Sequence, residues 1–127
     1  MTEIIWAFAI LCALHYIADF FIQVYAWKKS AKWIRNLIVH TIAYIFVIIL
    51  GIVVIGAAFP ALNIEYGNII AFISINAVLH FITDFFTKKL GKILHHYNEM
   101  TAFINVVALD QCIHYITLII TFGLFFL

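Results

Sequence analysis

Four long apolar segments limit how this chain can fold more than any other feature of its sequence. They cover approximately residues 4–27, 33–58, 68–88 and 101–127. A helix crosses the bilayer core with about 20 predominantly apolar residues, and its backbone hydrogen bonds all stay within the segment. The chain is 67% hydrophobic and 10% charged, whereas soluble domains are about half apolar and a quarter charged. We therefore expect an all-α integral membrane protein with residues 1–127 in a single transmembrane domain.

The short links between the segments predict an up-down four-helix bundle, in which sequential helices are antiparallel neighbours. Two segments carry near-copies of one motif, LHYIADFF at residues 14–21 and LHFITDFF at residues 79–86. A weaker likeness aligns His40 of the second segment with His114 of the fourth. The sequence thus predicts two repeated helical hairpins with the same orientation, as in transporters with parallel repeats.

The distribution of the basic residues predicts the orientation of the chain in the membrane. All seven Lys and Arg residues lie within residues 28–35 and 88–92. Cytoplasmic loops are enriched in these residues, so we expect both loops in the cytoplasm and both termini outside it. The first segment lacks a basic start and is too long for a cleaved signal peptide, which indicates a multi-pass protein. Basic residues beside spans favour contact with anionic lipid over nucleic acid.

Away from the span ends, the charged and imidazole side chains inside the spans are all histidine or aspartate. Three His/Asp pairs are spaced four residues apart, which places each pair on one face of a helix. An ionisable group at mid-bilayer costs about 3 kcal/mol on insertion scales. Hydrogen bonds that only hold helices together would need few such groups, so seven of them favour a functional site. Imidazoles and carboxylates are ligands for Zn, Mn and Fe. We therefore predict one or two divalent ions of this kind, bound by His15, Asp19, His40, His80, Asp84, Asp110 and His114.

The depth of these residues bears on the kind of function. The outer halves of the four segments contain no Asp, Glu, His, Lys or Arg. A transporter or proton relay would need polar groups that continue to the far side. A reaction site that opens to the cytoplasm or the inner leaflet needs no such continuation. The pattern therefore favours a cytoplasm-facing reaction site over a transport path.

The same residues resemble a known family pattern. The order of the motifs is similar to that of small bacterial and phage membrane proteins of unknown function, which are distantly similar to membrane-bound metal-dependent hydrolases of the SOS-regulated inner-membrane type. The resemblance implies a multi-span bundle in a bacterial inner membrane and a metal-dependent hydrolase activity. The motifs are His15-x3-Asp19-Phe20-x2-Gln23, His40, His80-x3-Asp84-x3-Lys88 and Asp110-Gln111-x2-His114.

Our first hypothesis is a hydrolase acting on a phosphate- or ester-containing amphiphile. Water activated by the ion would be the nucleophile, Asp110 would act as a catalytic base, and Lys88 would meet phosphate oxygens. Alternatively, Lys88 extends to the membrane interface. A second hypothesis is a metal ion or proton transporter. A third is a non-catalytic membrane subunit or effector whose polar core only fixes helix packing. The sequence leaves oligomer formation open.

Overall fold

The computed structural model describes residues 2–22, 33–60, 62 and 64–127. These residues form helices and contain no strand, which confirms the predicted all-α class. The first helix changes from α to π geometry near its end, where the wider turn of the π-helix replaces the ordinary i→i−4 pattern. The elements are α1 (Thr2–Tyr16), η1 (Ile17–Ile22), α3 (Trp33–Ala58), α4 (Tyr66–His96) and α5 (Met100–Phe126).

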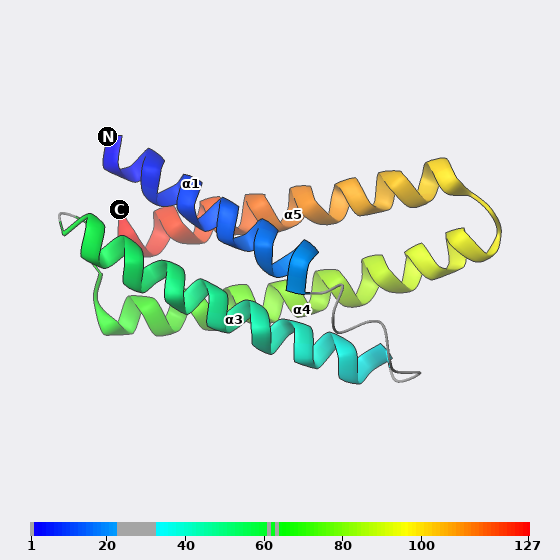
Figure 1. Ribbon diagram of the computed structural model, residues 1–127, viewed down its shortest axis with the longest axis horizontal. Helices are drawn as coiled ribbons and strands as arrows, with labels where there is room; N and C mark the ends of the chain where they lie inside the picture. The colour runs from blue at the N-terminus through cyan, green and yellow to red at the C-terminus, as the bar shows by residue number, and fades with distance from the viewer. Residues whose placement is uncertain (1, 23–32, 61, 63) are drawn as a thin grey trace.

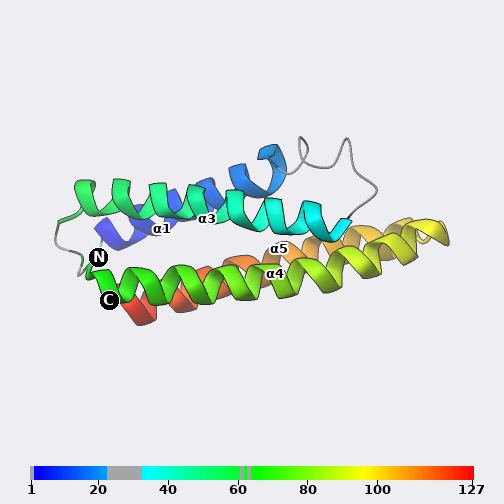
Figure 2. The same cartoon turned by 90° about the horizontal axis from the view of Figure 1, so that it is seen from below.

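The four long helices form an up-down bundle. In Figure 1 each helix runs antiparallel to the next one in the chain, and both termini lie at the same end as the link between α3 and α4. Figure 2 shows two hairpins, with α1 and α3 on one side and α4 and α5 on the other. Helix α1 packs on α3 and α5, and α4 packs on the same two helices. The predicted four-helix bundle is therefore confirmed.

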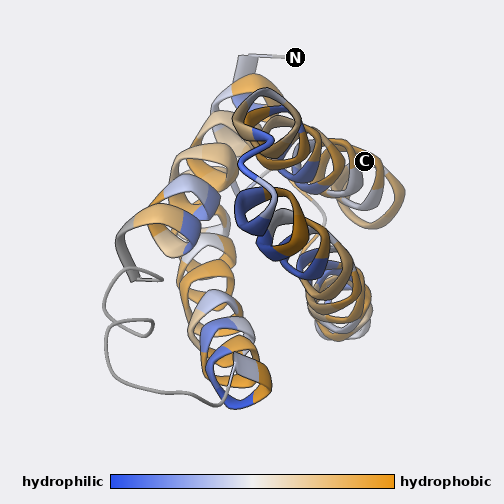
Figure 3. Ribbon diagram, turned by 90° about the vertical axis from the view of Figure 1, so that its right-hand side faces the viewer, coloured by the Kyte–Doolittle hydropathy of each residue, from blue (hydrophilic) through white to orange (hydrophobic). Residues whose placement is uncertain are grey.

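All four helices are long and apolar enough to cross a membrane. The candidate spans cover Thr2–Phe20 and the whole of α3, α4 and α5. Their outward faces are apolar, with Phe46 68% exposed and Ile70 65% exposed. The mostly orange ribbons in Figure 3 show the same property along the bundle. The chain is thus a multi-pass membrane protein, while the identity of the membrane and the side on which the termini lie stay predictions.

Helix α4 continues to His96, beyond the apolar segment that ends near residue 88. The chain then reverses over residues 97–99, where Asn98 adopts a left-handed conformation with φ 58°. Asparagine tolerates this conformation better than most residues. The Glu99 amide donates to the Leu94 carbonyl at 2.9 Å and closes the turn. The basic stretch 88–92 therefore lies on the last turns of a helix and not in an open loop.

An apolar core fills the half of the bundle nearest the termini. Gly51 of α3 faces α1 there, and a Cβ atom at this position would require the Leu14 side chain to move, since it would lie 2.8 Å from Leu14 Cδ1. The core side chains are buried between all four helices. They include Ala7, Leu11, Ile48, Ile52, Ile55, Phe72, Leu118, Phe122 and Phe126.

Candidate metal centre

The structure brings all seven predicted site residues into one buried cluster at the inner edge of this apolar core. They come from α1, η1, α3, α4 and α5, so every long helix contributes at least one side chain. None is more than 8% exposed. The histidine rings also contact one another, with centroids 5.1 Å apart for His40 and His80 and 4.3 Å apart for His80 and His114.

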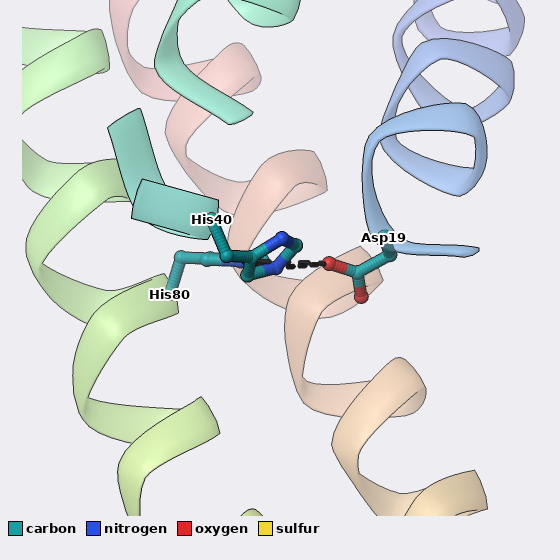
Figure 4. A group of neighbouring side chains, drawn as sticks. All are labelled: Asp19, His40 and His80. Carbon is teal, nitrogen blue, oxygen red and sulfur yellow. Dashed lines mark hydrogen bonds and ion pairs between the residues drawn. The ribbon is translucent and has the colours of Figure 1, made fainter. Parts of the chain in front are cut away.

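Ligand atoms of Asp19, His40 and His80 lie close enough together to hold a metal ion, and one oxygen of Asp84 lies beside the two imidazoles. His40 Nε2 lies 3.0 Å from both Asp19 Oδ1 and His80 Nε2. Asp84 Oδ2 lies 3.4 Å from His40 Nε2 and 3.6 Å from His80 Nε2. His80 Nε2 is 3.5 Å from Asp19 Oδ1. Ligand bonds of about 2.05 Å separate neighbouring ligand atoms by about 3.3 Å in tetrahedral and about 2.9 Å in octahedral geometry. We call these four atoms the primary group; Figure 4 shows three of its side chains converging.

A second set of ligand atoms lies beside the primary group. His114 Nε2 is 3.2 Å from Asp84 Oδ1 and 3.6 Å from Asp110 Oδ1. Asp84 thus directs one oxygen to the primary group and the other to His114. Asp110 Oδ1 also accepts a hydrogen bond from Thr87 Oγ1 at 2.6 Å, which fixes the carboxylate on the α4 side. We call His114, Asp110 and Asp84 Oδ1 the secondary group.

His15 belongs to the cluster but lies outside both the primary and the secondary group. Its Nε2 is 3.6 Å from Asp19 Oδ2, and its ring is enclosed by Tyr44, Tyr115 and His114 at centroid distances of 5.6, 5.1 and 5.2 Å. Neither ring nitrogen has a hydrogen-bond partner among the described residues, although His15 is fully buried. Buried polar atoms are almost always hydrogen-bonded, so this ring is suited to receive a further polar group.

The carboxylates of the primary group also have protein donors. The Lys88 ammonium donates to Asp84 Oδ2 from one helical turn away. Gln111 Nε2 donates to Asp19 Oδ2 at 2.7 Å and thereby links α5 to η1. Asp19 lies in the π-helical segment η1 and contacts both α3 and α5. Such π turns occur frequently at functional sites.

The two hairpins make matching contacts within the cluster. In the first, Asp19 meets His40 at 3.0 Å and His15 at 3.6 Å. In the second, Asp84 meets His114 at 3.2 Å and His80 at 3.6 Å. This correspondence is what an internal repeat would produce, and the repeat itself stays a prediction.

A family described as "Protein of unknown function (DUF3307)" matches residues 7–127 of this chain. The chain belongs to this family. The matched range contains all seven cluster residues, so the cluster lies within the part of the chain that defines the relationship. No curated protein and no solved structure matches the chain. The family description assigns neither an activity nor a source, so hydrolase similarity and a bacterial or phage origin stay predictions.

For this member of the family, the sequence indicated which residues form the buried cluster, but it did not indicate every side chain that hydrogen-bonds to them. The buried His and Asp groups could hold a metal ion; which of them bind one, and whether Asp110 and Lys88 are catalytic, stays a prediction. Thr87 was missed as a partner of Asp110, although it lies seven residues after His80, on the same face of α4. The neighbouring residue Gln23 falls outside the described residues.

Proposed function

We propose that this protein binds a divalent metal ion within its transmembrane bundle and hydrolyses a phosphate or ester bond of an amphiphile at the inner leaflet. The observation that carries the proposal is the set of five distances of 3.0–3.6 Å within the primary group. Two imidazole nitrogens and two carboxylate oxygens at this spacing suit Zn²⁺ best, since zinc favours four-coordinate N and O sites. Mn²⁺ and Fe²⁺ prefer more ligands, which the secondary group could add.

The position of the cluster supports a reaction site over a transport path. On the side of the termini, the core next to the cluster is built from apolar side chains such as Leu11, Phe72 and Leu118, each 0% exposed. Asn76 and Thr121 lie in this half but are uncharged and bonded to each other at 2.8 Å. An ion crossing the bundle would meet this apolar layer without ligands. The opposite side of the cluster leads to the basic end of the bundle, where anionic substrates would approach.

The residues of the chain divide into binding and proton-handling roles. A bound divalent ion would polarise a phosphoryl or acyl oxygen and lower the pKa of a water molecule toward about 7. Asp19, His40, His80 and Asp84 would hold the ion. Asp110 would accept a proton from the attacking water, because it lies next to His114 in the secondary group and outside the primary group.

Metal content is the direct test of the proposal. The purified protein would be treated with chelator, re-equilibrated with Zn²⁺, Mn²⁺ or Fe²⁺ and measured by elemental analysis. We expect stoichiometric metal in the parent and in His96→Ala, a matched control because His96 is exposed and lies outside the cluster. His40→Ala removes the central nitrogen of the primary group and should abolish retention. A parent protein without bound metal would refute the proposal and favour a structural polar core.

The reaction class needs a separate experiment. The metal-loaded protein would be reconstituted into liposomes, and the release of phosphate or headgroup would be compared with metal and proton flux. Asp110→Asn should keep the metal and stop product release. Flux without product release would refute hydrolysis and support the transporter.

A further inference from the structure

Lys88 lies at the point where the basic end of the bundle meets the carboxylate cluster. We infer that its ammonium is a resident counter-cation that restricts the site to one divalent ion. This inference rests on the proposed metal site and concerns how many ions that site accepts.

The contact of Lys88 is specific to one ligand oxygen. Its ammonium donates to Asp84 Oδ2, the same oxygen that belongs to the primary group. The Asp84 side chain is 1% exposed and that of Lys88 is 15% exposed, so the pair is largely withdrawn from water. A carboxylate oxygen has two lone-pair sites. One can accept the ammonium while the other faces His40 and His80, so the lysine and one metal ion are compatible.

The charges of the cluster then favour one ion. Its three carboxylates and one ammonium carry a formal net charge of −2, while the histidines are neutral when they act as ligands. One divalent ion neutralises this charge. A second would leave an uncompensated charge of +2 among apolar helices, where unpaired charge is strongly disfavoured.

Ligand groups for a second ion lie beside the first, because Asp19, Asp110 and His114 also lie close enough together to hold a metal ion. We therefore infer that charge limits the number of ions. His114, Asp110 and Asp84 Oδ1 form the secondary group, with distances of 3.2 and 3.6 Å to His114 Nε2. Paired metal sites place their ions about 3.5–4 Å apart, often on a shared carboxylate. Asp84 offers such a bridge, and Lys88 bonds to the same carboxylate. The ammonium thus contributes one positive charge beside the carboxylate that a second metal ion would have to share.

The number of ions per chain in saturating Zn²⁺ tests this inference. Parent protein should bind one ion. In Lys88→Met the cluster charge becomes −3, so two ions leave +1, which is no larger in magnitude than the −1 that one ion leaves. Charge then no longer opposes the second ion, and the remaining ligand groups should bind it. Lys88→Arg keeps the charge and should bind one. Lys89→Met is the matched control: Lys89 is the exposed neighbour, and this variant should also bind one. If Lys88→Met does not fold, Lys88→Gln replaces it with the same expectation.

The charge-retaining variant separates the effect of charge from that of space. Lys88→Arg fills more space than Lys88→Met but keeps the charge, and neither variant removes a ligand. One ion in the first and two in the second would therefore show that charge sets the count. Two ions in the parent, or one ion in both Lys88→Met and Lys88→Gln, would overturn the inference and leave the metal site standing. No ion in the parent would instead refute the proposed function itself.

Discussion

The ion pair between Asp84 and Lys88 has an energetic consequence for the protein without metal. Both side chains lie within the bundle, and the ammonium contacts the carboxylate directly. Two unit charges about 4 Å apart interact by about 4 kcal/mol at an effective dielectric constant of about 20. The cost of desolvating the two charged groups offsets part of this attraction. Removal of one partner, however, leaves the other charge buried and costs about 3–5 kcal/mol of stability.

A double-mutant cycle measures the coupling of this pair. Asp84→Asn should lower the free energy of unfolding by about 3–5 kcal/mol, since it strands the ammonium. Adding Lys88→Met removes the stranded charge, so the double variant should lose less than the sum of the two single variants. We expect a coupling energy of about 2 kcal/mol or more, within the range for residues in direct contact.

The assay is reversible unfolding in mixed detergent micelles with chelator present, followed by circular dichroism. Chelator is needed because bound metal would stabilise the folded state separately. A parallel cycle of Asp84→Asn with Lys89→Met should give coupling near zero, because Lys89 is exposed beside the pair. A coupling energy below about 0.5 kcal/mol for the Asp84 and Lys88 cycle would refute this account, since distant sites already deviate by that much.

Two further predictions concern the apolar half of the bundle. Gly51→Val should destabilise the protein by about 1–3 kcal/mol through overpacking, because its Cβ would lie 2.8 Å from Leu14 Cδ1. Gly123→Val is the control: its Cβ would have nothing within 4 Å, so stability should change by less than about 0.5 kcal/mol. Equal losses of the free energy of unfolding in detergent would contradict this prediction. Asn76→Leu should lower the free energy of unfolding by about 1 kcal/mol through loss of the 2.8 Å hydrogen bond to Thr121. Adding Thr121→Val to this variant should lower it little further. If the losses of the two single variants simply add in the double variant, the hydrogen bond contributes nothing.

The sequence was sufficient to predict the four spans and the membership of the cluster, but not the extension of α4 to His96 or the π-helical segment η1. Segment length and hydropathy are local properties, so each apolar run of span length specifies a helix without knowledge of its neighbours. The cluster followed from a similar argument, because ionisable groups within a bilayer must find polar partners. The spacing of His80 and Asp84 places both on one face of α4, and the structure turns that face inward.

The contacts between helices could not be predicted in the same way. A 3.6-residue period defines the polar face of each helix but not its rotation or axial position relative to its neighbours. Asp19, which contacts both His40 and Gln111, lies in the π-helical segment η1, for which the sequence carries no recognised signal. The contact of Lys88 with Asp84 could not be predicted either, because a lysine near a span end can also extend to the membrane interface.

The cross-helix contacts also suggest how metal binding would affect the bundle. Each primary carboxylate directs one oxygen to the primary group and the other to α5: Asp19 meets Gln111 there, and Asp84 meets His114. An ion in the primary group would therefore be connected through these carboxylates to every helix, including α5, which supplies none of its four ligand atoms. Because it would bind the folded arrangement alone, it would stabilise that arrangement by an amount that rises with the logarithm of the metal concentration above the dissociation constant. Cooperative stabilisation of all four helices by one ion is thus the expected signature of this centre, in contrast to local tightening of a single hairpin.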